Sequence, residues 1–277
     1  MDAARTLLVL GGSAPYSPLD RASLFWHSDL SLKTIVFDEG QARDEVGEWP
    51  DQGDSGVVAV PVTYPEDGLN GVILRPPLVA DAGDGAPIID GSDGTIGRGL
   101  RAPFTAEQLA WMHDAVSAYS IGTNLFLSAG ETLHSVLLST GGYTGSNAGV
   151  CLWLQKFAGG HKVVVSMADG TSAVNALETV ISAPQNAHLW LVVDQAQAKP
   201  LKLWLNGVQV DEWTGTLPTG AGAGSGYGLT FGNWARSGAY FGSAWKGRFV
   251  SIYREAITSQ AEIEKHAEWA ADQGYLG

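Results

Sequence analysis

The dipeptide Asn206-Gly207 constrains the fold of this chain more than any other feature of the sequence. It lies between two apolar runs, residues 201–205 (LKLWL) and residues 208–210 (VQV). A two-residue hairpin turn of type I′ requires a positive φ at both central residues, and Asn-Gly adopts that conformation readily. The pattern therefore predicts an antiparallel β-hairpin.

Alternation of side chains along a strand assigns a face to each residue of this hairpin. Leu203 and Leu205 are expected on a buried face, and Trp204 on the opposite face, which is open to ligand or solvent. Residues on either side of the turn then pair in order, Leu205 with Val208 and Leu203 with Val210. This register predicts that the return strand shares the buried face.

Short runs of β-favouring residues, separated by turn residues, recur along the rest of the chain. Three of them, residues 189–194, 227–232 and 246–254, flank the hairpin and predict an antiparallel meander with short links. The other predicted strands are residues 34–37, 42–49, 57–62, 88–89, 125–127, 135–139, 149–155, 161–167 and 175–181. Many short strands at near-regular spacing predict an all-β fold, an antiparallel β-sandwich.

Two segments have helical periodicity instead. In residues 105–116 the apolar positions recur at helical spacing, and Thr105 with Gln108 has the pattern of a capping box. Ser259 and Glu262 show the same pattern before a last helix that is expected to stop at Gly274. The sequence thus predicts two short helices beside the strands.

The chain is acidic, with a formal net charge of −13 over 277 residues. Binding to nucleic acid or to anionic membranes needs a basic surface, so this charge argues against both partners. No apolar run approaches the roughly 20 residues of a membrane span, so insertion into a membrane is not expected. The single cysteine, Cys151, lies in an apolar run, which predicts a buried thiol and excludes an intrachain disulfide.

Residues 1–20 contain Gly-Gly, Ala-Pro and Ser-Pro and have little apolar periodicity. Because each proline disfavours helix in the residue before it, this segment is predicted to be an extended leader or anchor, separable from the core. The apolar run within it, residues 6–10, is too short for the core of a signal peptide. Residues 21–277 are predicted to form one domain.

The second half of the chain carries a series of short motifs in a definite order. A strand that ends at Asp194 is followed by LKLWLNGVQV, LTFGN and WKGRFVSIYREAITSQAEIEKH, within residues 188–277. This series resembles the closing half of concanavalin A-like lectin/glucanase (laminin-G-like) jelly-roll domains. The FWH, GEWPDQ and IIDGSDG segments extend the resemblance loosely over the first half. The resemblance implies a jelly-roll β-sandwich over residues 21–277.

The same resemblance implies a calcium ion, because many jelly-roll lectins hold one with carboxylates from loops. The loop acids that could supply hard oxygen ligands are Asp51, Asp54, Asp90 and Asp93. The alternative is that these acids form turns, since Asp-Gly and Ser-Asp-Gly are ordinary turn sequences. A calcium site is therefore one of two interpretations.

Glycosidases of this fold class place two carboxylates on one strand, on either side of the scissile bond. The nearest pattern here is Glu45, Glu48 and Asp51, and its spacing of three residues turns Glu45 and Glu48 to opposite faces of a strand. A solvated loop edge is the better interpretation of this pattern. No catalytic residue is predicted.

Aromatic and polar residues gather in the C-terminal part of the chain. Sugar rings stack on aromatic faces while their hydroxyl groups bond to Asn, Asp and Arg. The glycan-binding candidates are Trp204, Asn233, Trp234, Arg236, Tyr240 and Trp245. The same residue types are enriched in subunit interfaces, so packing at the sandwich edge or at an interface is the alternative.

These observations predict a non-enzymatic carbohydrate-binding or adhesion module. The acidic charge, the lone cysteine and the leader before a lectin-like domain resemble a tailed-bacteriophage virion protein, which implies a place on the virion surface as a head fibre, decoration or tail tip. The expected partners are a cell-surface or capsular polysaccharide, other virion subunits and further copies of this chain in a homo-oligomer. A purely structural capsid or tail decoration protein is the alternative, and a glycan-cleaving enzyme is the third hypothesis.

Overall fold

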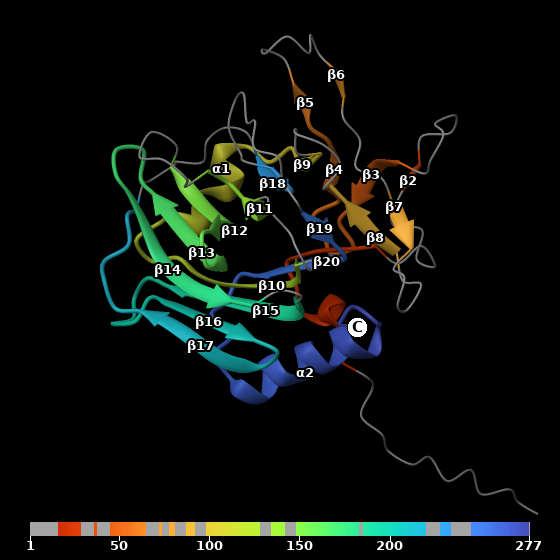
Figure 1. Ribbon diagram of the computed structural model, residues 1–277. Coiled ribbons are helices and arrows are strands. Elements are labelled where there is room, and N and C mark those ends of the chain that lie inside the picture. The colour runs from red at the N-terminus through yellow and green to blue at the C-terminus, as the bar shows by residue number, and fades with distance from the viewer. Residues whose placement is uncertain are drawn as a thin grey trace, which may run out of the picture.

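The computed structural model of the chain describes residues 16–28, 36–37, 45–64, 72–73, 78–80, 87–91, 98–127, 134–141, 148–182, 185–219, 228–233 and 245–276. Within these residues two antiparallel sheets lie face to face, and a C-terminal helix covers the outer face of one of them (Figure 1). The predicted all-β sandwich is therefore confirmed. None of the described helices is long and apolar enough to cross a membrane.

The first sheet, called here the six-stranded sheet, has the order β1-β20-β10-β15-β16-β17. The first described strand of the chain therefore pairs with the last one, antiparallel. Its strands are β1 Leu24–His27, β20 Phe249–Tyr253, β10 Ala118–Leu127, β15 Gln185–Asp194, β16 Leu201–Leu205 and β17 Val208–Trp213.

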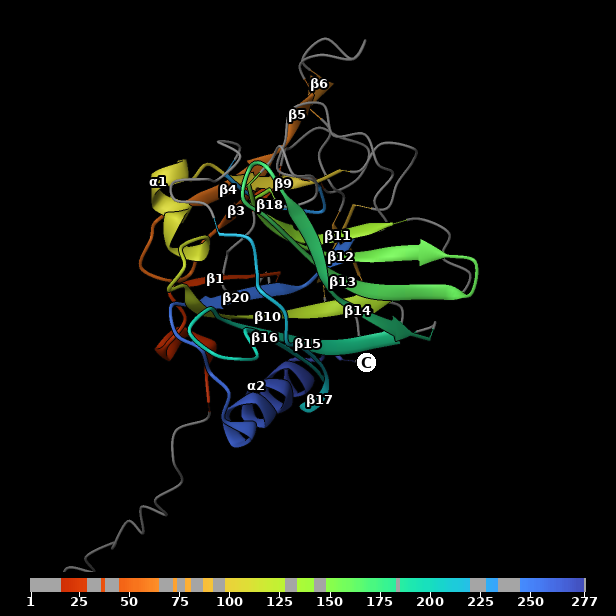
Figure 2. The same ribbon diagram turned by 90° about the vertical axis from the view of Figure 1, so that its left-hand side faces the viewer.

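The second sheet, called here the nine-stranded sheet, has the order β14-β13-β12-β11-β18-β9-β4-β3-β2. Figure 2 shows it above the six-stranded sheet. Its strands are β14 Ala173–Ile181, β13 Gly160–Ala168, β12 Gly149–Phe157, β11 Ser135–Ser139, β18 Leu229–Phe231, β9 Leu100–Ala102, β4 Val58–Pro61, β3 Val46–Pro50 and β2 Val36–Phe37.

Two smaller sheets complete the described strands. One has the order β19-β8-β7, and the other is the pair β5-β6. Their bounds are β19 Lys246–Gly247, β8 Pro87–Asp90, β7 Leu78–Ala80, β5 Thr63–Tyr64 and β6 Val72–Ile73.

Buried apolar side chains from both main sheets fill the space between them. Leu191 and Leu203 come from the six-stranded sheet, and Leu152 and Val165 from the nine-stranded sheet. All four are fully buried, so the sandwich core is held together mainly by the removal of apolar surface from water. The predicted burial of Cys151 is also confirmed, and burial raises the pKa of its thiol.

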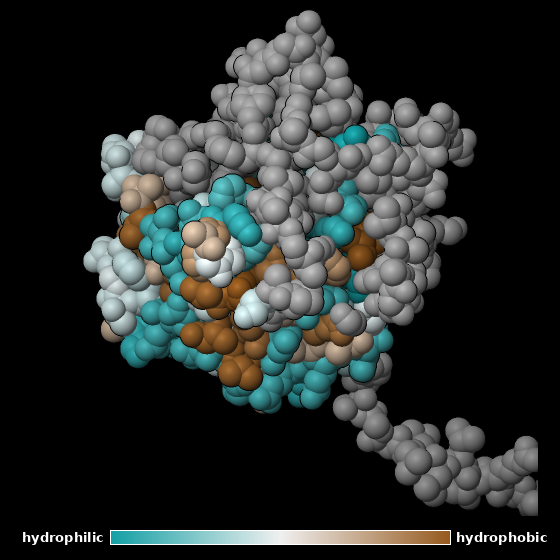
Figure 3. Space-filling view, in the orientation of Figure 1, coloured by the Kyte–Doolittle hydropathy of each residue, from teal (hydrophilic) through white to brown (hydrophobic). Residues whose placement is uncertain are grey.

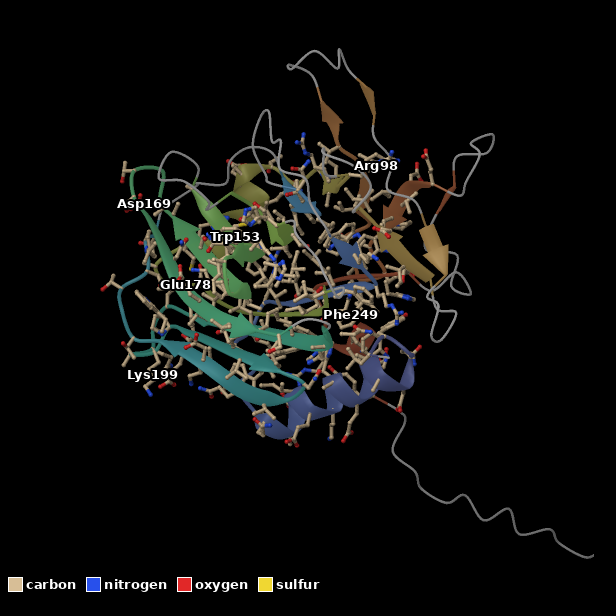
Figure 4. The ribbon with its side chains drawn as sticks, in the orientation of Figure 1. Arg98, Trp153, Asp169, Glu178, Lys199 and Phe249 are labelled. Atoms are coloured by element: carbon tan, nitrogen blue, oxygen red, sulfur yellow. The ribbon has the colours of Figure 1, made fainter. Side chains whose placement is uncertain are left out.

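The outer face of the six-stranded sheet is also buried, because the helix α2 (Gln260–Asp272) packs against it. Trp190, Trp204 and Phe249 of the sheet meet Ile263 and Ala270 of the helix in what we call the helix-side cluster. Figure 4 shows the labelled Phe249 between the sheet and α2. The six-stranded sheet is therefore covered on both faces.

The Asn206-Gly207 turn has the predicted conformation, with φ values of 49° and 76°. Leu205 pairs with Val208 across this turn, as predicted. The strongest local signal of the sequence is therefore confirmed, since it depends only on the residues of the turn.

The predicted register fails one step further along the hairpin. A register shift between Leu203 and Trp204 places Leu203 opposite Asp211 instead of Val210. Val208 and Val210 are exposed, at 63% and 41%. The prediction that the return strand shares the buried face is wrong, because β17 is the edge strand of its sheet and lies at the margin of the sandwich.

The predicted meander is also wrong beyond this hairpin. Strands β15, β16 and β17 do follow one another in one sheet. However, β18 crosses to the nine-stranded sheet, where it lies between β11 and β9, and β20 returns between β1 and β10. Such crossings let the core form between two sheets, which a meander within one sheet cannot do.

The helix α1 (Ala106–Leu109) begins as predicted and ends early. Thr105 and Gln108 form both hydrogen bonds of the capping box, at 3.2 and 2.8 Å. A 3-10 turn, Ala110–Met112, follows α1, and Val116 is 80% exposed. The predicted helix over residues 105–116 is therefore too long by more than one turn.

The helix α2 ends at the predicted stop, where Gly274 has a φ of 73°. Ile263 and Ala270 are fully buried, as its periodicity predicts, and His266 is buried beside them. Ser259 occupies the N-cap position, but its side chain makes no capping hydrogen bond, so the predicted capping box is wrong. Packing on the sheet, more than its cap, holds this helix.

The described part of the predicted leader, residues 16–20, contacts the domain. The Tyr16 and Tyr253 hydroxyl groups are 3.3 Å apart, and the Tyr16 ring lies 5.8 Å from that of His266. A short 3-10 helix, Pro18–Asp20, follows. Residues 1–15 lie outside the described residues.

Candidate functional site

Trp204, predicted to face ligand or solvent, is instead buried beneath α2, with 2% of its surface exposed. Its Nε1 donates to Oε1 of Gln260 at 3.3 Å, and its ring belongs to the helix-side cluster. The prediction of an open face is wrong because α2 covers the face of β16 opposite the leucines. Trp204 therefore has no ring face to offer a ligand.

Trp245 and Asn233 are buried as well, at 1% and 2%. The Trp245 ring belongs to the core and lies 6.4 Å from that of Trp49, so packing, the alternative interpretation, describes it. The backbone carbonyl of Asn233 accepts a hydrogen bond from Oγ1 of Thr230 at 2.8 Å. The other predicted glycan-binding residues, Trp234, Arg236 and Tyr240, lie outside the described residues.

The buried carboxylate of Asp51 is surrounded by hydrogen-bond donors. It accepts bonds from the backbone N–H groups of Phe25, Gly53 and Ser55 at 2.6, 3.0 and 3.2 Å, and from Oγ of Ser55 at 2.5 Å. A calcium ion needs several oxygen acceptors around it, so this environment does not fit the implied cation. Within the described ranges, no three His, Cys, Asp or Glu residues form a metal-binding group.

The other acids of the implied calcium site lie in different surroundings. Asp90 of β8 forms an ion pair with Nζ of Lys246 at 3.4 Å. Asp54 is exposed on the loop between β3 and β4, and Asp93 lies outside the described residues. Turn formation, the alternative interpretation, fits Asp51 best, because its carboxylate organises that loop.

The three acids of the weak glycosidase pattern also separate. Glu45 forms an ion pair with Arg98 at 3.5 Å and is largely buried, Glu48 is exposed on β3, and Asp51 is buried in its own loop. The predicted solvated loop edge therefore describes Glu48 alone.

A pocket of about 450 Å³ opens at one edge of the sandwich, where β1, α1 and the loop between β3 and β4 meet. We call it the edge pocket. Its apolar lining includes Leu24, Phe104 and Leu109. Its polar or aromatic lining is Ser23, Asp54, Ser55, Gln108, Trp111 and Arg254.

Arg254 follows β20 and lies over the indole ring of Trp111, with Cζ 4.7 Å from the ring centroid. The Tyr119 ring meets the same indole edge-on, at 5.7 Å and 87°. These contacts orient the guanidinium by a cation–π interaction. Among the residues that the structure describes, no carboxylate forms an ion pair with it.

The side-chain amide nitrogen of Gln108 is a second hydrogen-bond donor in the same pocket. Its Oε1 accepts a hydrogen bond from the backbone N–H of Thr105 in the capping box, which fixes the amide. Its Nε2 donates to none of the described residues. The capping box therefore presents an amide N–H₂ group to the pocket.

Asp54 supplies a hydrogen-bond acceptor to the pocket, in contrast to these two donors. Its side chain is exposed, lines the pocket and accepts a hydrogen bond from no group in the described ranges. The hydrogen bonds that Asp51 accepts from Gly53 and Ser55 fix the backbone on either side of Asp54. The Arg254 guanidinium and the Gln108 amide nitrogen are thus donors, and the Asp54 carboxylate an acceptor, that form no hydrogen bond or ion pair with the described residues.

The outer face of the nine-stranded sheet carries a second polar group of side chains, which includes Trp153 and Glu178 (Figure 4). Nε1 of Trp153 donates to Oγ of Ser166 at 3.0 Å, which donates to Oδ1 of Asn175 at 2.7 Å. Glu178 pairs with Lys162 at 2.6 Å. Because these groups bond to one another, this face offers fewer free groups than the edge pocket.

A chain of polar groups under α2 has the residue types of a nucleophile site. Nε2 of His188 lies 2.8 Å from Nδ1 of His266, and Nε2 of His266 lies 3.0 Å from Oγ of Ser251. All three residues are fully buried, so no substrate reaches them. Burial lowers the pKa of His188 to about 3 and that of His266 well below its usual value, which keeps both rings neutral.

The edge pocket is missing from the sequence-based predictions because its lining comes from four separate segments. Gln108 is identifiable as a capping residue and Trp111 lies in the predicted helix, but nothing in the sequence connects them with Arg254 or Asp54. The pairing of β20 with both β1 and β10 brings Arg254 to this edge.

No known family model matches the chain, and no curated protein matches its sequence. Solved structures do match it in fold. Domain 4 of AbnA, a GH43 extracellular arabinanase from Geobacillus stearothermophilus in complex with arabinotriose, has a TM-score of 0.53 and 15% identity. The match covers 89% of this chain and 99% of that domain.

Two larger proteins match over part of their length. A sialidase of Trypanosoma rangeli has a TM-score of 0.55 and 14% identity, over 98% of this chain and 36% of its own. A structure of botulinum neurotoxin type C, whose cell entry depends on interaction with two ganglioside molecules, has a TM-score of 0.50 and 9% identity, over 86% and 51%. These similarities show a shared β-sandwich fold.

Proposed function

We propose that the chain is a non-enzymatic glycan-binding module and that the edge pocket is its binding site. The observation that carries this proposal is the convergence of Arg254, Gln108 and Asp54 beside an indole ring in a pocket of about 450 Å³. That volume lies within the range of small-molecule sites. The shared fold with an arabinanase domain seen with arabinotriose supports the same class of ligand.

The lining matches the chemistry of a sugar. Each hydroxyl group of a sugar both donates and accepts a hydrogen bond, so a sugar site needs both polarities. Asp54 can only accept, whereas Arg254 and the amide nitrogen of Gln108 can only donate. The apolar wall, with Phe104 and Leu109, fits the C–H faces of a pyranose ring.

The pocket lining does not support hydrolysis. Both mechanisms of glycoside hydrolysis generally use two carboxyl groups flanking the bond. Asp54 is the single carboxylate among the described residues that line the pocket. We therefore propose binding without cleavage, and release of reducing ends from any bound polysaccharide would contradict this part of the proposal.

A glycan array probed with the full chain tests the binding proposal. Trp111→Ala should abolish the signal on every bound glycan, because it removes the ring that orients Arg254. Trp213→Ala is the matched control: both tryptophans are half-buried and pack against the same core, but Trp213 lies on β17, at the opposite edge of the six-stranded sheet from β1. Equal loss in both variants, or retention in Trp111→Ala, would contradict the edge pocket as the site.

A second candidate function, subunit docking, is favoured by a different surface. Val180 on β14 and Val208 and Val210 on β17 are exposed at 66%, 63% and 41%, and a hydrogen bond of 2.7 Å from Thr179 to Asp211 joins these two edge strands. Figure 3 shows hydrophobic surface where Figure 1 draws β14, β16 and β17. Exposed apolar edge strands are places where chains associate.

In this second candidate function the chain docks to further copies of itself or to other virion subunits on the surface of a tailed-phage particle. The support for the particle is the resemblance in the sequence together with the acidic charge. Val208→Lys with Val210→Lys should lower the oligomeric mass in solution by light scattering, whereas Val116→Lys, exposed at 80% away from these strands, should not. A monomeric wild-type chain that fails to bind phage particles would contradict this function.

A further inference from the structure

The guanidinium in the edge pocket forms no ion pair within the described residues, whereas several other cations of the chain do. The chain carries 29 acidic and 16 basic side chains, so most cations have acids available. Arg21 pairs with Glu255 at 2.7 Å and Arg98 with Glu45 at 3.5 Å, for example. Arg254 lines a cavity without an ion-pair partner in the described part of the chain.

The contact with Trp111 holds this guanidinium without neutralising its charge. The guanidinium lies over the ring, with Cζ 4.7 Å from the centroid. The N–H groups lie in the guanidinium plane, where they form a fork that matches the two oxygens of a carboxylate. An arginine held in this way is pre-organised to bind a planar anion.

Gln108 adds a second donor and Asp54 sets the polarity of the rest of the pocket. The amide N–H₂ of Gln108 is held in place by the capping box, so it can join Arg254 in binding the same oxygen atoms. The carboxylate of Asp54 repels anions and accepts hydrogen bonds only from O–H or N–H groups. A ligand that fits both therefore has a negative end and a hydroxyl-bearing end.

We propose that the edge pocket selects acidic glycans, sugars that carry a carboxylate, with Arg254 and Gln108 on the carboxylate and Asp54 on hydroxyl groups. This inference rests on the proposed glycan-binding function and names its ligand class. Hexuronic acids and sialic acids share this chemistry. A neutral sugar leaves the guanidinium unpaired on binding, which is unfavourable for a charged donor.

The test measures affinities by isothermal titration calorimetry with two matched pairs of ligands. Trigalacturonic acid is compared with its methyl ester, and sialyllactose with its methyl ester, so that each pair differs only in whether the carboxyl groups are charged. The wild-type chain is expected to prefer the acid in at least one pair. Which acid binds distinguishes a hexuronic acid from a sialic acid.

Two variants and one control test whether the preference for the acidic ligand depends on the edge pocket. Arg254→Gln should weaken the affinity for the acidic ligand by about 10- to 150-fold, which corresponds to the loss of one charge-assisted hydrogen bond. The affinity for the neutral ligand should stay nearly unchanged. Gln108→Glu keeps the capping box, because glutamate at this position also accepts from Thr105, but places a negative charge beside the ligand. Lys265→Gln removes one positive charge from an exposed site on α2 and should change neither affinity.

The outcomes separate this inference from the function on which it rests. Neutral and acidic ligands bound equally, or acid selectivity retained in both variants, would overturn the inference and leave glycan binding in place. A wild-type chain that binds no glycan of either kind overturns both. Gln108→Glu guards against misfolding as an explanation, since it preserves the cap, and its far-ultraviolet circular dichroism should match the wild type.

Discussion

Acid should destabilise this protein through the two histidines buried under α2. In the folded chain His188 and His266 are neutral, because burial holds the pKa of His188 at about 3 and that of His266 well below 6.5. In the unfolded chain both have a pKa of about 6.5. The unfolded state therefore binds more protons at acidic pH, so stability falls as the pH drops from about 6.5 towards 3.

The size of the effect follows from this difference in pKa. Between pH 7.5 and pH 5.0 each neutral buried imidazole should lower the free energy of unfolding by about 2 kcal/mol, and the pair by about 4 kcal/mol. Burial also lowers the pKa of His113, to about 4. Its contribution to the loss of stability is similar in every variant, so it cancels from the comparison.

The perturbation is the double variant His188→Gln, His266→Gln, which removes both titrating groups. Urea unfolding followed by tryptophan fluorescence gives the free energy of unfolding at pH 7.5 and at pH 5.0. The wild type should lose about 2–4 kcal/mol more than the double variant over this range, even if the variant is less stable at both. His134→Gln, at a half-buried histidine outside the helix-side cluster, should change this loss much less.

An equal loss in the wild type and the double variant would refute the reasoning. It would mean that the folded protein protonates one of these rings without cost, so that α2 does not exclude water from them. The contact of 2.8 Å between Nε2 of His188 and Nδ1 of His266 would then be a hydrogen bond of a charged imidazole instead of one between two neutral rings.

Two further predictions concern packing and the pocket wall. Trp204→Ala should cost about 3–5 kcal/mol of stability, at least as much as Leu203→Ala at about 2–5 kcal/mol, because both faces of β16 are buried; a Trp204→Ala variant with wild-type stability in urea would show that α2 leaves the sheet in solution. Asp51→Ala should lower the free energy of unfolding by about 2 kcal/mol, because the backbone N–H groups that donate to this carboxylate would lose their acceptor. It should also weaken glycan binding by loosening the loop that carries Asp54, and unchanged stability together with unchanged affinity would show that this loop is held by other contacts.

Local chemistry by itself determined the features that depend on neighbouring residues. The Asn206-Gly207 turn and the stop of α2 at Gly274 follow from positive φ values that these residues adopt at low cost. The capping box of Thr105 and Gln108 follows from spacing alone. Alternation and the β-branched runs likewise predicted β11 at its observed bounds and most of β12 and β13.

Tertiary structure decided what covers each face and which distant residues meet. A strand pattern shows that Leu203 and Trp204 point in opposite directions, but whether the second face meets solvent depends on α2, which begins more than fifty residues later. The same holds for the pairing of His188 with His266. The edge pocket exists because β20 pairs with β1 and with β10, which brings Arg254 beside Leu24 and Trp111, and these pairings depend on the free energy of the whole core.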